Sequence, residues 1–389
     1  MITREEFEIL CRGEVRQAVD RRIDDDPLAV ALDKRLPHAA LVASQVKYLA
    51  RARKKLPSYR EARCIIPPLA YEQASGEACA MLKDIGGDTA LDLTCGLGVD
   101  SFALARRFRR IVALERDEVL AEVARENFRR LGTDNVEVLC TSAENFIKQA
   151  LREGMHFDWI YADPDRRGAD GRKKVVAADC SPDVVTMMPQ LKALADGVLL
   201  KMSPMFDIDE ALRVFGPCSA GAVSQNDECK EVTVRIDGLE PSVRASAAGR
   251  GSFGVTAAER AAARCTDVSA FDPSKYGWLV QPDVALQKTR LAPLHLAGRA
   301  DIFSANGYGF AAAKPDGETL ARVYEIERIE RYDPRALRRE MKGCRVQIML
   351  RDVPLTAAAI MQATGMREGG GCKLAFTSVG REIWVIRLK

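Results

Sequence analysis

The chain has 389 residues, of which 47% are hydrophobic and 29% are charged. This composition supplies enough apolar surface for folded cores and excludes a mainly disordered protein. No run of residues approaches the roughly 18 consecutive apolar residues of a membrane-spanning helix, and the acidic residues at the start predict no signal peptide. We therefore expect a soluble, cytoplasmic protein that does not bind a membrane. The net charge of +3 permits nucleic-acid binding without arguing for it.

Cysteine and histidine residues are poorly placed for a metal or disulfide framework. The 11 cysteines are scattered without a Cys-x-x-Cys pair, and the three histidines lie far apart in the sequence at positions 38, 156 and 295. Zinc sites need paired thiolates or neighbouring histidines. We predict reduced cysteines and no metal site.

The first 66 residues predict a helical region. Thr3 and Glu6 form a capping-box pattern, and Asp26-Pro27 has the sequence of a second helix start. Basic residues over 51–55 end a third predicted helix. Such a run is either a solvated helix end or a patch that faces phosphate, and the sequence leaves both interpretations open.

Residues 67–240 alternate short apolar runs with helical patterns, which is typical of a parallel sheet flanked by helices. We predict strands over 90–93, 111–114, 136–140, 159–162 and 198–201, and helices over 100–108, 117–131, 182–194 and 208–215. Two further strands, 222–224 and 231–236, flank a polar turn and predict a closing hairpin. The prediction is an α/β domain with a Rossmann-like, seven-stranded, mostly parallel sheet.

The remaining sequence predicts small α+β modules. Residues 241–270 are rich in glycine and alanine and give weak signals. From residue 271 onward, apolar alternation predicts strands over 276–280, 347–350, 374–378 and 383–387 among short helices. We divide this part into modules over 241–315 and 316–389.

A glycine turn follows the first predicted strand. It runs from Asp92 through Gly96 and Gly98 into a helix, and Glu115 ends the next strand about 20 residues later, where a ribose would be bound. The dinucleotide fingerprint needs a third glycine where Ser101 stands, and a pyrophosphate would be repelled by the acid at the start of the turn. A cationic sulfonium donor is favoured by that acid, so we predict S-adenosylmethionine rather than NAD.

Two later strand ends border the same predicted site. Glu144 follows the third strand, where an acid would meet the adenine amino group, and Asp163-Pro164 follows the fourth. The Asp163 carboxylate and the neighbouring carbonyl could accept hydrogen bonds from an amine and position it for methyl transfer. Asp163 could equally be a strand-end turn residue, and Arg166 and Arg167 could be surface ion-pair partners.

Several motifs together resemble a known family. The residues 92–100, the Asp-Pro-Asp-Arg-Arg segment 163–167 and the Lys-Met-Ser-Pro-Met-Phe-Asp segment 201–207 resemble class I S-adenosylmethionine-dependent methyltransferases. More narrowly, the chain is similar to a bacterial subfamily with a C-terminal THUMP-like domain. The segments 73–77, 229–231 and 368–377 also match that group.

The resemblance implies a ferredoxin-like or THUMP-like fold for the C-terminal modules, and a set of site residues. It places donor-binding residues at Asp92, Thr94, Gly96, Gly98, Asp100, Glu115, Arg116, Ala143, Glu144 and Asp163, and catalytic residues at Asp163 and Pro164. It places substrate contacts at Arg166, Arg167 and Lys201. Amino-directed nucleic-acid methyltransferases usually have a second proline and an aromatic ring after Asp-Pro, where this chain has Asp165 and Arg166. That departure argues against adenine N6 and leaves other acceptors open.

The predicted substrate is RNA, either tRNA or rRNA, with a base and its exocyclic amine among the candidate acceptors. THUMP domains of related enzymes bind RNA, and six basic residues between 328 and 342 form a predicted patch. Two alternatives stay open: a methyltransferase for a small molecule or a protein, and a non-catalytic RNA-binding protein with a vestigial donor pocket. The intact acids argue against the second. The sequence does not predict the oligomeric state.

Overall fold

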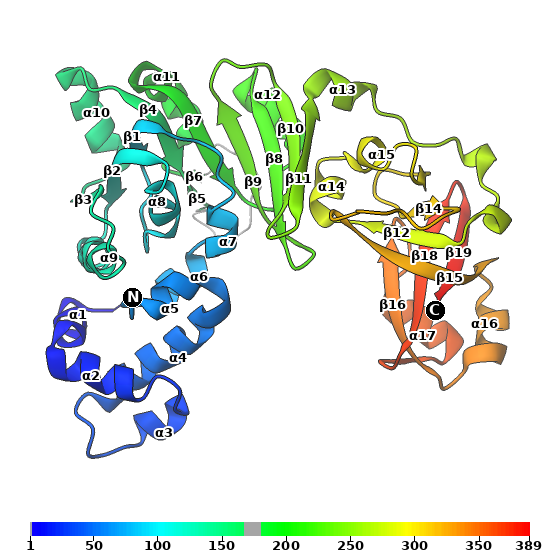
Figure 1. Cartoon of the computed structure of the whole chain (residues 1–389), viewed down its shortest axis with the longest axis horizontal. Helices are drawn as coiled ribbons and strands as arrows, with labels where there is room; N and C mark the ends of the chain where they lie inside the picture. Colours follow the sequence, from blue (N-terminus) through cyan, green and yellow to red (C-terminus); the bar gives the residue numbers. More distant parts are fainter. Residues whose placement is uncertain (1, 167–179) are drawn as a thin grey trace. The chain divides into compact units, whose positions relative to one another are not determined.

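The computed structural model describes residues 2–166 and 180–389, and the chain divides into two compact units (Figure 1). The first unit comprises residues 1–218 and 231–239, and the second comprises 219–230 and 240–389. The predicted four-part division of the chain stays a prediction. No helix among the described residues is long and apolar enough to cross a membrane.

Among the described residues, the predicted N-terminal helical region over 1–66 contains five helices, and two more follow before the first strand. Thr3 caps the first helix in a capping box with Glu6, and Asp26 caps the third, where Pro27 occupies the first helical position. The buried Asn127 side chain bonds both the N–H and the carbonyl of Ile65, which fastens the end of this region to the next part of the unit. The helices are α1 (Arg4–Cys11), α2 (Gly13–Arg21), α3 (Pro27–Ala31), α4 (Ala39–Lys55), α5 (Pro57–Glu61), α6 (Pro68–Gln73) and α7 (Glu77–Ala80).

The main sheet of the first unit is parallel except at one strand. Its strand order is β9-β7-β4-β1-β2-β3, and β9 pairs antiparallel with β7. The strands are β1 (Gly87–Asp92), β2 (Phe108–Glu115), β3 (Val136–Cys140), β4 (Phe157–Ala162), β7 (Ala195–Met202) and β9 (Glu228–Ile236). A separate pair, β5 (Asp165–Arg166) and β6 (Cys180–Ser181), lies just after β4 in the chain.

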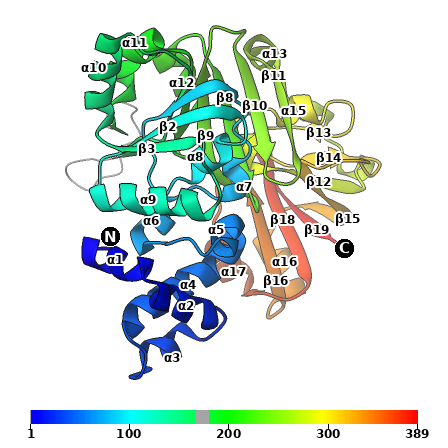
Figure 2. The same cartoon turned by 60° about the vertical axis from the view of Figure 1, so that its left-hand side comes forward.

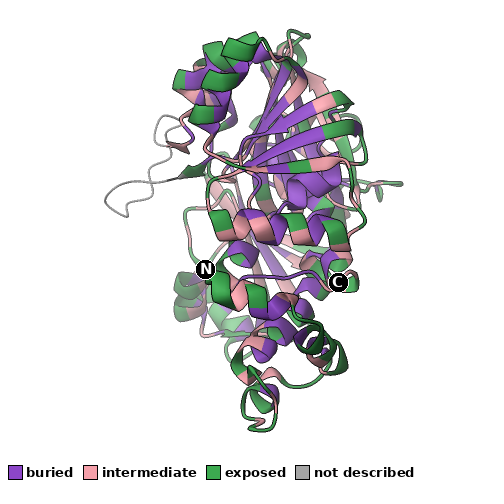
Figure 3. Cartoon of the chain, turned by 90° about the vertical axis from the view of Figure 1, so that its left-hand side faces the viewer, coloured by how far each residue is buried: buried purple, intermediate pink, exposed green. Residues whose placement is uncertain are grey.

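Helices cover both faces of this sheet. Figures 1 and 2 show α8 and α9 on one face and α10 and α11 on the other. The central strands are buried while the outer sides of the helices are exposed (Figure 3), which is the burial pattern of a doubly covered parallel sheet. The helices are α8 (Val99–Leu104), α9 (Glu118–Arg130), α10 (Ala143–Glu153), α11 (Val184–Leu194) and α12 (Ile208–Phe215).

The predicted seven-stranded sheet is wrong in its strand number, because the sheet has nine strands. Six belong to the first unit, and β8 (Ser219–Gln225), β10 (Ser242–Ala247) and β11 (Gly251–Thr256) belong to the second. β10 pairs in parallel with β8, and β11 pairs antiparallel with β10. The sequence missed β10 and β11 because their Ser, Ala and Gly residues give almost no apolar alternation.

The second unit also contains an eight-stranded sheet, in the order β13-β14-β12-β15-β19-β18-β16-β17. Strands that we had assigned to two modules lie in this one sheet, because β12 pairs with β15. Its strands are β12 (Trp278–Pro282), β13 (Asp301–Ile302), β14 (Gly309–Ala311), β15 (Ala321–Arg331), β16 (Arg345–Arg351), β17 (Arg367–Glu368), β18 (Cys372–Val379) and β19 (Glu382–Leu388). Its α-helices are α13 (Ala257–Ala262), α14 (Val284–Lys288), α15 (Ala292–His295), α16 (Pro334–Met341) and α17 (Ala357–Thr364).

Candidate active site

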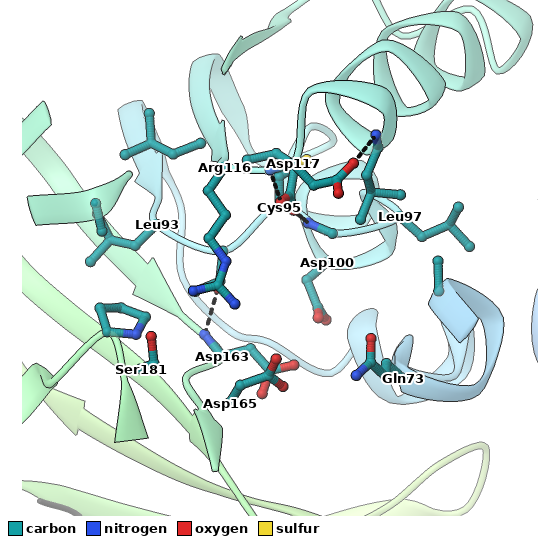
Figure 4. Close-up of a pocket in the computed structure, with 18 of the residues that line it drawn as sticks. Gln73, Leu93, Cys95, Leu97, Asp100, Arg116, Asp117, Asp163, Asp165 and Ser181 are labelled. Atoms are coloured by element: carbon teal, nitrogen blue, oxygen red, sulfur yellow. Dashed lines mark hydrogen bonds between the residues drawn. The ribbon is translucent and has the colours of Figure 1, made fainter. Parts of the chain in front are cut away.

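A pocket of about 440 Å³ lies in the first unit, next to the carboxyl ends of β1, β2, β3 and β4. In open parallel sheets this edge is where ligands bind. Figure 4 shows Asp100, Asp163 and Asp165 around one space, with Gln73 across from them. The polar residues of its wall are Gln73, Ser75, Thr94, Asp100, Glu115, Arg116, Asp117, Thr141, Ser142, Glu144, Asp163, Asp165 and Ser181.

The glycine turn forms as predicted between β1 and α8. Gly96 and Gly98 have φ angles of 55° and 86°, a region that disfavours residues with a Cβ atom. Gly96 lines the pocket, but Gly98 does not. A Cβ atom at Gly98 would lie 2.6 Å from Cζ of Phe128 on α9. Gly98 is therefore needed for the packing of α8 on α9, a constraint that the sequence did not reveal.

Asp92 lies behind the turn rather than on the pocket wall. Its carboxylate accepts hydrogen bonds from Thr94 N at 2.8 Å and from Ser101 Oγ at 2.5 Å, and the residue is 1% exposed. Burial raises the pKa of Asp92 to about 7, although both hydrogen bonds oppose this rise. The acid that we predicted beside the donor thus acts on the pocket through its charge and through the turn that it holds.

Thr94 connects the ends of two strands. Its hydroxyl accepts a hydrogen bond from Asp163 N at 2.7 Å and donates to Asp92 at 3.3 Å. The first residue after β4 is thereby held next to the turn after β1.

Glu115 closes the turn from the end of β2. One carboxylate oxygen accepts from Gly96 N at 2.9 Å and the other accepts from Asp117 N at 2.8 Å. Asp117 in turn caps α9 by accepting from Leu120 N. Both N–H bonds leave the further lone pairs of the carboxylate available to a diol of a ligand.

The Asp163 carboxylate forms an ion pair with Lys201 of β7. The Lys201 side chain is 12% exposed, and that of Asp163 is 34% exposed. Burial raises the pKa of Asp163, against the effect of Lys201. For Lys201, burial favours the neutral amine, but Asp163 and then Asp100 outweigh it and raise the pKa. Lys201 does not line the pocket and is held by Asp163, so its predicted contact with the substrate stays a prediction.

The structure brings most of the predicted site residues together. Those on the pocket wall are Thr94, Gly96, Asp100, Glu115, Arg116, Ala143, Glu144 and Asp163. Those not on the wall are Asp92, Gly98, Pro164, which is buried, and Lys201. Arg166 lies on β5, and Arg167 lies outside the described residues. The roles assigned to all of these residues remain predictions.

Sequence reasoning missed several residues of the wall. Gln73 and Ser75 belong to a segment noted only for its resemblance, and Asp117 was included only as the first residue of a predicted helix. Asp165 and Ser181, which pair across β5 and β6, also line the pocket. The available signal for Asp165 was its position close to the end of β4, two residues after Asp163. Among the described residues, no group of three or more His, Cys, Asp or Glu side chains could hold a metal ion.

Comparisons with known proteins match this architecture. Residues 86–215 match the family described as a methyltransferase domain. A solved structure from Porphyromonas gingivalis W83, assigned as a methyltransferase, is 23% identical and has a TM-score of 0.79. The match covers 100% of this chain and 98% of that one, so the two proteins share their fold.

Curated relatives match the central part of the chain. A tRNA/tmRNA (uracil-C(5))-methyltransferase of Shewanella piezotolerans is 31% identical over 33% of this chain and 40% of its own length. A 23S rRNA (uracil(1939)-C(5))-methyltransferase of Xanthomonas campestris is 34% identical over 27% of this chain and 26% of its own length. The chain thus spans less than half the length of both relatives. These matches and the pocket show that the chain contains a methyltransferase domain.

Proposed function

We propose that the protein is an S-adenosylmethionine-dependent methyltransferase that modifies RNA. The observation that carries this proposal is the group of carboxylates in the pocket at the carboxyl edge of the sheet in the methyltransferase domain. Asp100, Glu115, Glu144 and Asp163 all line one pocket of about 440 Å³, a volume within the range of pockets for small ligands. Such a wall suits a ligand that carries positive charge, as S-adenosylmethionine does at its sulfur and its amino group.

The residues of the wall divide into those that would hold the donor and one that would face the acceptor. We infer that Glu115 binds the ribose of the donor and that Glu144 binds its adenine. Asp100 and the glycine turn would bind the methionine end. The other contributing residues there are Thr94, Arg116 and Ala143. When bound, S-adenosylmethionine supplies an activated methyl group. Asp163, fixed through Thr94 and Lys201, orients the acceptor by accepting its hydrogen bonds, and a restrained geometry of this kind accelerates transfer.

RNA is supported as the substrate by the printed activities of the curated relatives, which modify tRNA, tmRNA and 23S rRNA. We further propose that residues 316–389 are a THUMP-like domain that contacts RNA, as in the subfamily that the chain resembles. The exposed cations Arg335, Arg339 and Lys342 on and after α16 supply positive charge there.

An exocyclic amine of a base is the acceptor that the site supports best. Carbon 5 of uracil reacts only after a nucleophile adds to the ring, and a thiolate is the usual nucleophile for such a step. Cys95 is the only cysteine on the pocket wall within the described residues, and burial raises the pKa of its thiol well above the usual value. Asp163 offers instead a carboxylate that can accept the hydrogen bonds of an amine.

Methyl transfer to RNA tests the proposal. Wild-type protein should transfer labelled methyl groups from S-adenosylmethionine into RNA from a strain that lacks the protein, and nucleoside mass spectrometry should find an N-methylated base. Asp163→Asn, which keeps the side-chain shape next to Lys201, should keep donor binding within about threefold and lower the transfer rate at least about 100-fold, because a misplaced acceptor is that costly.

The donor site is tested separately by calorimetry. Glu115→Ala should weaken donor binding by about 1.5–3 kcal/mol, since it removes a charged hydrogen-bond acceptor. Asp84→Asn, which changes an exposed carboxylate, serves as the control in both assays. Label that enters only small metabolites would refute the RNA substrate, and the absence of donor binding would refute the proposed activity.

A further inference from the structure

A row of alternating charges lies beneath the pocket of the first unit. Lys83, in the loop between α7 and β1, has a side chain that is 1% exposed. Its Nζ atom lies 2.7 Å from Asp100 Oδ1 and 3.2 Å from Glu231 Oε1 on β9. The Glu231 side chain is 2% exposed. A cation buried this deeply is stable only when carboxylates compensate it.

This row reaches the pocket through Asp100. The other carboxylate oxygen of Asp100 accepts a hydrogen bond from Ser75 Oγ at 2.7 Å, and both residues line the pocket. Lys201 interacts electrostatically with Asp100 and forms the ion pair with Asp163. Charges of alternating sign therefore extend from Glu231 to Asp163, on which acceptor positioning depends.

We propose that Lys83 and Glu231 are positioning residues for the donor: Lys83 keeps Asp100 ionised and oriented toward the positively charged methionine end, and Glu231 holds Lys83 and adds negative charge to the field of the pocket. Neither side chain lines the pocket, so both act through Asp100. This inference rests on the proposed function, because it assumes a cationic donor in the pocket. It also gives a role to the segments 73–77 and 229–231, whose residues Ser75 and Glu231 belong to the row.

Lys83 and Glu231 carry opposite charges, so replacing one or the other should have different effects on the ionisation of Asp100 and on the charge of the pocket. Burial alone would raise the pKa of Asp100, but Lys83 and then Lys201 outweigh it and hold that pKa below its usual value. Without Lys83, the buried Asp100 carboxylate would lose its principal cation and would take up a proton at a higher pH. Without the charge of Glu231, Asp100 would stay ionised, but the pocket would be less negative wherever wild-type Glu231 is ionised.

Other titratable groups face the same row and contribute to its field. Asp92 of β1, Tyr161 of β4 and Tyr59 of α5 interact electrostatically with Asp100, and Lys83 Nζ lies 5.6 Å from the centre of the Tyr161 ring. Both tyrosines are buried and have raised pKa values, so they stay neutral. Burial raises the pKa of Asp92 to about 7, and each variant is therefore compared with wild type at the same pH.

Calorimetry from pH 6 to pH 8.5 tests the proposal. It compares the affinity for S-adenosylmethionine with that for S-adenosylhomocysteine, whose sulfur carries no charge. At pH 6, Lys83→Met should bind S-adenosylmethionine about tenfold more weakly than wild type, because the unpaired Asp100 is protonated. At pH 8.5 the order should reverse, with Lys83→Met about three- to tenfold tighter, because the pocket has lost a positive charge.

Glu231→Gln should behave differently from Lys83→Met. It should bind S-adenosylmethionine about three- to tenfold more weakly than wild type at both pH values, while its affinity for S-adenosylhomocysteine changes less than about twofold. Asp84→Asn, next to Lys83 in the chain and in an exposed ion pair, should match wild type throughout. If Lys83→Met does not fold, the difference between the two ligands in Glu231→Gln decides the question.

A purely structural role would weaken both variants at every pH and for both ligands, and that result would overturn the proposal. Wild-type affinity in both variants would overturn it as well. If wild-type protein bound neither ligand, the proposed function would fail. The thermal midpoint of ligand-free protein would then test the charge row alone. Between pH 8.5 and pH 6 the midpoint of Lys83→Met should rise relative to that of wild type as the pH falls, because only its folded state takes up a proton at Asp100, and a difference that does not change with pH would overturn the proposal.

Discussion

Several side chains at the pocket have structural roles that their position in the sequence only partly indicates. Asp92, Glu115 and Asp163 were predicted as ligand-binding acids because each lies at the carboxyl end of a strand. In the structure each also accepts hydrogen bonds from the glycine turn or holds a neighbouring strand end in place. The residues that bind a ligand and those that shape its site are therefore partly the same, and a substitution at Glu115 reports on both.

The raised pKa of Asp92 predicts that donor affinity depends on pH. Burial raises this pKa to about 7, so the ligand-free protein holds a proton there at pH 6 and loses it by pH 8. A cationic donor favours the ionised carboxylate, so its affinity should rise with pH, by at most about tenfold per pH unit since one proton is released, and should level off above pH 7. Calorimetry of S-adenosylmethionine binding from pH 5.5 to 8.5 measures this.

Asp92→Asn is the matched variant for that measurement, because an amide can keep the hydrogen bonds to Thr94 and Ser101. It should flatten the rise in affinity. Stability should change with pH in the opposite direction to donor affinity. Between about pH 4 and pH 7 the folded state binds more protons than the unfolded chain. The wild-type free energy of unfolding should therefore fall, relative to that of the variant, as the pH rises from about 4 to about 7. A wild-type affinity that is constant with pH would contradict the assignment.

At the scale of elements, the sequence predicted the bounds of helices and strands well where local signals agree. α12 (Ile208–Phe215) and β3 (Val136–Cys140) match their predicted bounds, because a cap or an apolar run marks each end. The predicted helix over 100–108 ends at Leu104 instead, since Phe108 joins β2 and the pairing of that strand with β1 overrides helical periodicity. The ion pair of Lys83 with Glu231 joins residues 148 apart in the chain, a separation that no local pattern encodes.

The contact of α8 with α9 makes Gly98 a sensitive position. Gly98→Ala should lower the free energy of unfolding by about 2–4 kcal/mol, because the new methyl group collides with Phe128 and the positive φ disfavours alanine. Gly132→Ala is the control: Gly132 also has a positive φ, of 65°, but a Cβ atom there meets nothing within 4 Å. Gly132→Ala should lower the free energy of unfolding by about 1–2 kcal/mol, because only the backbone strain of alanine at a positive φ contributes. Urea unfolding followed by circular dichroism compares them, and equal costs would show that Phe128 moves aside.

At the scale of the whole molecule, the match to a methyltransferase domain covers residues 86–215 of the first unit, and the second unit contains an eight-stranded sheet of its own. The sequence indicated the domain through its alternating strands and helices, but it did not reveal that strands within 241–315 and 316–389 belong to one eight-stranded sheet. Strand pairing between distant segments, such as β12 with β15, depends on tertiary contacts rather than on sequence patterns. The solved structure from Porphyromonas gingivalis matches this chain over 98% of its own length, so the same combination of folds occurs in that protein.

The second unit should contribute electrostatically to RNA binding. Replacing Arg335, Arg339 and Lys342 with glutamine should reduce the slope of log affinity against log salt by about 0.7–0.9 for each phosphate contact that is lost. Among the described residues, none of these three cations forms an ion pair, so each can neutralise a phosphate. S-adenosylmethionine affinity should stay unchanged, since the donor pocket belongs to the first unit.

A matched triple variant in the first unit makes that measurement specific. Arg12, Arg16 and Arg21 are exposed residues at the start of and along α2, and their replacement with glutamine changes the net charge by the same amount. Fluorescence anisotropy with labelled tRNA at several salt concentrations gives the slope for each protein. If the α2 variant reduced the slope as much as the α16 variant did, the effect would come from net charge alone, because a phosphate contact needs a particular surface whereas a general field does not. A smaller slope confined to the α16 variant would instead place phosphate contacts on the second unit.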